Sequence, residues 1–152
     1  MIDVASVQNL ITSWWFDYDQ GNFAEWPAYF TADAHFTCQS DSGATAFEEF
    51  VTADVAGREA LLAWQEDHRR NSPYPLRHNG TNIHVASSDG NEATFRSYIF
   101  VTQIVDGAVS NLSSGQCLGT VRDEDGSLRI AELRVILDCT NSEVFDKDPV
   151  AR

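Results

Sequence analysis

The chain has 152 residues, of which 43% are hydrophobic and 11% aromatic, so it can bury the core of one ordinary domain and is not disordered. Its formal net charge of −13 argues against nucleic acid or an anionic membrane surface as a partner. No composition shift divides the sequence, and we expect one domain over residues 1–152 in which 142–152 form a flexible tail.

The cysteines and the N-terminus indicate a compartment. Cys38, Cys117 and Cys139 form no CxxC pair and lack the spacing of a secreted disulfide framework. Residues 1–10 lack the basic region and apolar run of a signal peptide, and no run reaches the roughly 18 apolar residues of a membrane span. We therefore predict reduced thiols and a cytoplasmic location.

The first half of the chain is predicted to be mainly helical. Apolar residues with helical spacing predict a helix over 3–19, and Gly21 is a suitable terminator directly after it. A second, short helix is predicted over 23–30, followed by a strand over 35–39. The segment 40–56 is rich in small and acidic residues, which is typical of a mobile loop or lid, with a helical turn within it.

The second half is predicted to be mainly strands. Gly57 precedes a predicted helix over 58–70, which the sequence Asn71-Ser72-Pro73 ends. The apolar period then changes to two, and Asp- and Gly-rich turns separate the runs. Strands are expected over 76–86, 92–105, 110–122 and 128–140. Three early helices followed by hairpin-linked strands predict an α+β domain with a mostly antiparallel sheet.

Two acidic residues border the apolar stripe of the first helix near its C-terminal end. Asp17 and Asp19 flank the stripe on opposite edges, and helical geometry alone does not decide which one faces the interior. A carboxylate at this end of a helix meets the negative end of the helix dipole unless a cation lies nearby. Periodicity alone favours solvated side chains at both positions.

The histidines carry no metal-site pattern. His78 begins a predicted strand, and Gly80 after it favours a bulge that would re-aim the imidazole. A lone histidine is more often structural, and His35, His68 and His84 are interpreted in that way. No two histidines have metal-ligand spacing on a helix, no Cys–His cluster occurs, and the common phosphate-binding and GxSxG motifs are absent. We therefore predict acid–base chemistry without metal or cofactor.

Two short stretches resemble known enzymes. Tyr18-Asp19 followed by Gly21 to Trp26 resembles the end of the first helix in scytalone dehydratases. The stretch Arg77-His78-Asn79-Gly80-Thr81-Asn82 resembles the His-x-Gly-Thr-Asn strand of hexachlorocyclohexane dehydrochlorinases. Together with the order of helices and strands, they identify a resemblance to the SnoaL-like branch of the nuclear-transport-factor-2-like superfamily. This implies a cone-shaped, curved sheet wrapped by three N-terminal helices, a cystatin-like α+β barrel.

The resemblance also implies catalytic roles. Asp19 would orient and charge His78, His78 would remove a proton, and Tyr18 would donate a hydrogen bond to a carbonyl or leaving group. The sequence departs from these relatives where they carry a further tyrosine, histidine and lysine, at positions near Phe36, Gln103 and Trp14. The substrates of those relatives are therefore not implied.

The other candidate binding residues are aromatic or hydrogen-bonding side chains that could line a cavity for a flat, small apolar or aromatic ligand. They are Trp15, Trp26, Tyr29, Phe36, Phe47, Phe50, Trp64, Asn82, Tyr98, Phe100, Gln103 and Gln116.

Three functions remain open. The first is a cofactor-independent lyase of the dehydratase type, acting on a small cyclic or polyketide-like metabolite. The second is an isomerase or polyketide cyclase that uses the same Asp-His pair, and the third is a non-catalytic small-molecule-binding module. Ile130 and Ile136, expected on the outer sheet face beside Glu132 and Arg134, predict a homodimer or homotrimer.

Overall fold

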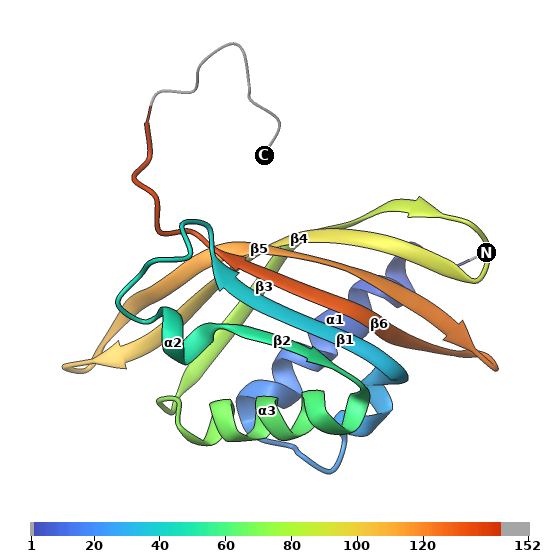
Figure 1. The fold of residues 1–152 in the computed structure, drawn as a ribbon, viewed down its shortest axis with the longest axis horizontal. Helices are drawn as coiled ribbons and strands as arrows, with labels where there is room; N and C mark the ends of the chain where they lie inside the picture. Colours follow the sequence, from blue (N-terminus) through green and yellow to red (C-terminus); the bar gives the residue numbers. More distant parts are fainter. Residues whose placement is uncertain (1, 144–152) are drawn as a thin grey trace.

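A computed structural model describes residues 2–143 (Figure 1). The predicted tail, 142–152, lies outside the described residues from 144 onward. The elements, in chain order, are α1 (Val4–Gln20), the 3-10 helix η1 (Trp26–Tyr29), β1 (Phe30–Ser40), α2 (Glu48–Val51), β2 (Ala53–Ala56), α3 (Arg58–Arg70), β3 (Leu76–Ser88), β4 (Glu92–Val105), β5 (Ala108–Glu124) and β6 (Ser127–Leu137). The expected α+β class is confirmed.

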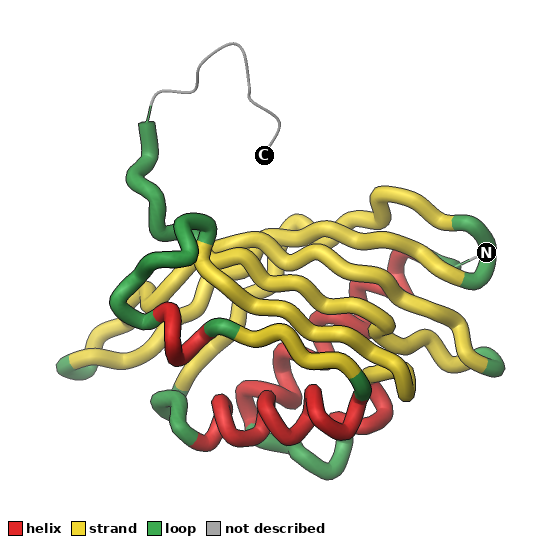
Figure 2. The backbone as a smooth tube through the Cα atoms, in the orientation of Figure 1, coloured by secondary structure: helices red, strands yellow, loops and turns green. Residues whose placement is uncertain are grey.

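The six strands form one curved sheet in the order β2-β1-β6-β5-β4-β3. Strands β1 and β6 pair in parallel, and every other neighbouring pair is antiparallel. Helices α1 and α3 lie against one side of the sheet, where α1 packs on β3 and α3 packs on β1 (Figure 2). The sheet does not close on itself, because β2 and β3 are its two edges.

Helix α1 begins and ends close to where the apolar spacing predicted. The Asp3 carboxylate accepts a hydrogen bond from the backbone N–H of Ser6 and caps the first turn. Gly21 follows the helix with a left-handed φ of 68°, and its N–H binds the carbonyl oxygens of Asp17 and Tyr18. These caps fix where the helix stops and thereby which residues stand at its C-terminal end.

The predicted helix over 23–30 is wrong beyond one short turn. Only Trp26–Tyr29 is helical, and Phe30 already has the extended backbone of β1. The buried apolar residues that suggested one helix belong to two different elements, η1 and β1. Trp26 and Phe30 both pack edge-on against Trp14, at ring-centroid distances of 5.2 and 4.7 Å.

The segment 40–56 is more ordered than the predicted loop. It contains α2 and the strand β2, which pairs with β1 between His35 and Cys38. The Glu48 carboxylate accepts hydrogen bonds from the N–H and hydroxyl of Ser40 and from the hydroxyl of Thr45, and these bonds lower the pKa of Glu48 to about 2. The sequence missed β2 because four edge-strand residues give too short a pattern to detect.

The bulge in β3 is displaced from the predicted position. The register with β4 shifts between Thr81 and His84, and Asn82 has a φ of 55°. Gly80 keeps regular pairing, with Ile99 opposite it. Its lack of a side chain is needed for packing, because a Cβ would lie 3.3 Å from the Trp15 ring.

One residue expected on the outer sheet face is in the core. Ile130 is fully buried, because the β5–β6 register shifts between Thr120 and Val121 and reverses the alternation before Glu132. Ile136 is partly exposed and Arg134 is exposed, as expected for the outer face.

Candidate active site

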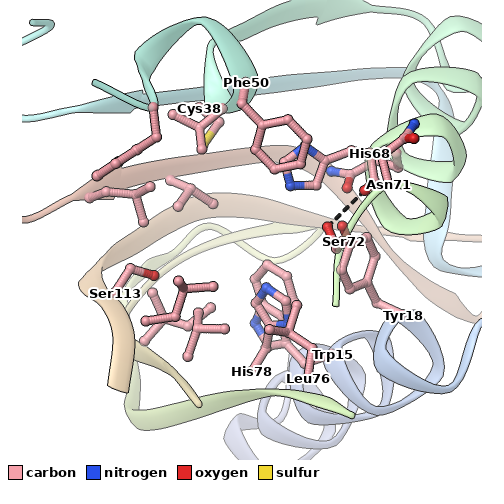
Figure 3. A pocket seen from close by; sticks show the side chains of 18 of the residues that line it. Trp15, Tyr18, Cys38, Phe50, His68, Asn71, Ser72, Leu76, His78 and Ser113 are labelled. Atoms are coloured by element: carbon pink, nitrogen blue, oxygen red, sulfur yellow. Dashed lines mark hydrogen bonds between the residues drawn. The ribbon is translucent and has the colours of Figure 1, made fainter. Parts of the chain in front are cut away.

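A cavity of about 290 Å³ lies between the helices and the concave side of the sheet. Its walls come from α1, β1, α2, α3 and the strands β3 to β6, and most of the lining is aromatic or aliphatic (Figure 3). The expected binding residues among the lining are Trp15, Phe36, Phe47, Phe50 and Trp64, together with Tyr18 and His78. A largely apolar hollow with a few polar groups is typical of a site for a small organic molecule.

Asp19 and His78 are joined by two hydrogen bonds at one wall of this cavity. The ring Nδ1 of His78 lies 2.6 Å from Oδ1 of Asp19, and the backbone N–H of His78 donates to Oδ2 at 2.7 Å. The side chain of His78 is only 14% exposed and that of Asp19 only 5%. Because a carboxylate accepts at Nδ1, the neutral imidazole carries its proton there and keeps a lone pair on Nε2.

Aromatic packing fixes the orientation of the His78 ring. Trp15 stacks on it with a centroid distance of 4.9 Å and an interplanar angle of 6°, while Tyr18 meets it edge-on at 5.1 Å. Asp19 is buried behind the ring and does not line the cavity. The imidazole is therefore the member of the pair that a bound molecule meets.

Tyr18 stands beside the pair as a protonated phenol. The side chain is 2% exposed and lines the cavity. Burial raises the pKa of Tyr18 well above its ordinary value, with the charge of Arg69 acting in the opposite direction. The phenol can therefore donate a hydrogen bond at any physiological pH.

Arg69 provides the cation that the end of α1 requires. This guanidinium is 6% exposed and donates to the backbone carbonyls of Tyr18, Asp19 and Pro73. It satisfies the Asp19 carbonyl, which the helix end leaves without an intrahelical hydrogen bond, and opposes the negative end of the helix dipole next to the Asp19 carboxylate.

The choice between Asp17 and Asp19 is resolved by their partners. The Asp17 carboxylate accepts hydrogen bonds from the Tyr29 hydroxyl and, at 2.8 Å, from the side-chain amide of Asn22. These contacts lie outside the cavity, so Asp19 is the acid that faces His78.

Sequence reasoning missed a second histidine in the cavity. His68 was interpreted as an ordinary structural residue, but it lines the cavity and lies between the rings of Phe50 and Trp64, at 4.3 and 4.9 Å. Burial lowers the pKa of His68, which favours a neutral ring. The available signal was the position of His68 one helical turn after Trp64 on α3.

Seven of the expected binding residues do not line this cavity. Trp26 is buried in the core under α1, and Tyr29 is bound to Asp17. The others do not line the cavity: Asn82, Tyr98, Phe100, Gln103 and Gln116. Tyr98, Phe100 and Gln116 are exposed because their strand positions alternate with the inward-facing Ile99 and Cys117.

Within 2–143, no three His, Cys, Asp or Glu side chains are grouped so that they could hold a metal ion. No helix in this part of the chain is long and apolar enough to span a membrane.

Comparison with known proteins connects this geometry to a family. A family model described as a SnoaL-like domain matches residues 1–134. A protein of unknown function from Mycobacterium tuberculosis has a similar structure, with 25% identity and a TM-score of 0.72 over 88% of this chain and 70% of that one. No curated protein sequence matches the chain.

Two other solved structures share the fold. A candidate scytalone dehydratase from Novosphingobium aromaticivorans has 17% identity and a TM-score of 0.71, covering 97% of this chain and 93% of that one. The β subunit of benzoate 1,2-dioxygenase from Burkholderia mallei has 21% identity and a TM-score of 0.68, covering 90% of this chain and 91% of that one. At these identities the similarity establishes the fold alone.

Proposed function

The chain belongs to the SnoaL-like domain family, and from that premise we propose that it is a cofactor-independent acid–base enzyme. We assign it as a lyase of the dehydratase type that acts on a small cyclic or polyketide-like metabolite. The observation that supports this proposal is the buried Asp19–His78 hydrogen bond at the wall of an apolar cavity.

In the proposed first step, Nε2 of His78 removes a proton from a C–H bond next to a carbonyl. The electrons of that bond move toward the carbonyl oxygen and form an enolate. The Asp19 carboxylate stabilises the imidazolium that results, and the neutral Tyr18 phenol donates a hydrogen bond to an oxygen of the substrate.

In the second step, the enolate electrons form a C=C bond and a β-hydroxyl group leaves. The imidazolium returns its proton from Nε2 to the departing oxygen, so water is released and neutral His78 is restored. A single base can perform both transfers because the Asp19 bond at Nδ1 is kept throughout.

An isomerase or polyketide cyclase is the second candidate, because the same proton abstraction starts those reactions. The mass of the product separates them: elimination removes water, whereas isomerisation conserves mass. A third candidate is a non-catalytic ligand-binding module, which would use the cavity without proton transfer.

The proposal is tested with a simple ketone as probe. In D2O, the wild-type protein should accelerate exchange of the acidic C1 hydrogens of 2-tetralone for deuterium, followed by NMR. His78→Ala should reduce this acceleration by about 100-fold or more. His84→Ala is the matched control, because His84 lies on the same strand and is exposed, and its ring lies against the Asn82 carbonyl. Wild-type exchange in His78→Ala would rule out His78 as the base.

We also propose that the chain forms a homodimer or homotrimer through the outer sheet face. Tyr98 and Phe100 are 57% and 39% exposed on β4, and Tyr98, Gln116 and Ile136 are successive cross-strand neighbours. Exposed aromatic residues on a broad sheet favour association.

A cytoplasmic location remains our proposal as well. Cys38, Cys117 and Cys139 are all free thiols, as expected for a protein kept in a reducing compartment.

A further inference from the structure

Gln65 on α3 has a buried side-chain amide without a partner. The residue is 3% exposed, and its Nε2 has no hydrogen-bond partner among the described residues. It is also one of the residues that line the cavity. A buried N–H donor without a partner is costly, so such a group at a cavity wall needs an acceptor from a bound molecule.

Gln65 stands one helical turn from the residue that binds the backbone of Asp19. Leu61, Gln65 and Arg69 form the buried stripe of α3, spaced four residues apart. Arg69 is fixed on the Asp19 carbonyl by its guanidinium, and Gln65 lies one helical turn before it. One turn is about 5.4 Å along the helix, and Gln65 and His78 both line the same cavity.

The other orphaned buried groups do not offer the same donor. Trp14 and Thr31 do not line the cavity. Trp15 lines it, but a Cβ at Gly80 would lie 3.7 Å from its Nε1, so this edge of the ring faces β3. Gln65 is therefore the unpartnered donor that a ligand in the cavity can satisfy.

We infer that Gln65 is a substrate-binding residue whose Nε2–H donates a hydrogen bond to a carbonyl oxygen of the substrate. The substrate is then an uncharged, mainly apolar ring compound that carries a ketone. Within residues 2–143, no lysine or arginine lines the cavity to compensate an anion, and the net charge of −13 disfavours one further. The assignment of the ketone as the group that activates a C–H bond rests on the proposed function, whereas the Gln65 hydrogen bond does not.

The test compares 2-tetralone with tetralin, which has the same rings without the carbonyl. Equilibrium dialysis of the full chain gives a dissociation constant for each. The ratio of the water–octanol partition coefficients of the two probes gives the difference in affinity expected from polarity alone. Relative to that expectation, wild-type protein should bind the ketone about tenfold more tightly. Gln65→Met should lose this corrected preference and bind tetralin at least as well as wild type does.

Two further variants keep the result decisive. Gln65→Leu repeats the experiment with a different apolar side chain, and the unfolding midpoint of either variant should equal or exceed that of wild type because an orphaned donor is removed. Gln116→Met is the matched control, since Gln116 is exposed on β5 and should not affect binding. A wild-type protein without the corrected preference, or Gln65 variants that retain it, would overturn the inference.

The outcome is separable from that of the proposed function. His78→Ala should lose deuterium exchange but keep the preference for the ketone over tetralin. If exchange proves independent of His78 while Gln65→Met still loses the preference, the catalytic proposal fails and the Gln65 assignment stands.

Discussion

The guanidinium of Arg69 donates two hydrogen bonds to the backbone carbonyl of Asp19, at 2.8 Å from Nη2 and 3.3 Å from Nε. Helix α3 thus holds the C-terminal end of α1 from a position 50 residues further along the chain. The Asp19 carboxylate on the same residue binds His78 on β3. One residue therefore joins two helices and a strand, which positions the imidazole at the cavity wall.

Replacement of Arg69 by methionine should destabilise the protein by about 2–4 kcal/mol. The substitution leaves the buried carbonyl of Asp19 without its partner and removes the cation at the helix end. Urea unfolding measures the loss. Arg70→Met is the control: Arg70 is exposed and makes a surface pair with Glu66, so its loss should cost less than about 1 kcal/mol. Equal effects of the two substitutions would contradict the role of Arg69.

Asp19→Asn should lower deuterium exchange of 2-tetralone by about 100-fold while the protein stays folded. The amide has one acceptor oxygen and can keep only one of the two hydrogen bonds from His78, and it carries no charge to stabilise the imidazolium. Asp17→Asn is the matched control two residues away, because Asp17 binds Tyr29 and Asn22 outside the cavity. A comparable loss in both variants would mean that helix stability, rather than the Asp19 charge, controls the exchange.

The sequence predicted the elements that repeat a clear pattern. Helix α3 spans the predicted range of 58–70 because Gly57 and Asn71 mark its two ends, and β4 spans 92–105 because a long apolar alternation marks it. Local rules did not predict the shift in β6 that buries Ile130, nor the bulge at Asn82, because a register shift depends on the neighbouring strand.

The candidate site was predictable only in part, because it depends on contacts between elements that are distant in the sequence. Asp19 at the helix end and His78 at the start of β3 lie together. A family resemblance, and not periodicity, predicted this pair. The polar residues of α3 were missed, since Gln65, His68 and Arg69 look like ordinary solvated helix positions in the sequence. Their burial depends on how α3 crosses the end of α1, which no local pattern encodes.

Self-association through the outer sheet face should be abolished by Tyr98→Glu combined with Phe100→Glu. Both side chains are exposed on β4, and two added carboxylates in a chain of net charge −13 would oppose a second copy. Sedimentation equilibrium should give a multiple of 16.9 kDa for wild type and the single-chain mass for the variant. Phe16→Glu, at an exposed phenylalanine of α1, should leave the mass unchanged. A wild-type mass of one chain would refute the proposal.

Protonation of His68 should contribute to the loss of stability in mild acid. Burial lowers the pKa of His68 below its ordinary value of 6.5, while a hydrogen bond to the backbone of Phe50 acts against this shift. The unfolded chain therefore binds the proton first as the pH falls. The stability contributed by neutral His68 is complete above about pH 6.5 and declines as the pH falls toward the lowered value.

His68→Phe keeps a ring between Phe50 and Trp64 but cannot titrate, so its unfolding free energy should fall less than that of wild type between about pH 7.5 and pH 5. His84→Phe places the same substitution at an exposed histidine and should retain the wild-type dependence, whereas an unchanged dependence in His68→Phe would show that this ring does not titrate in the window.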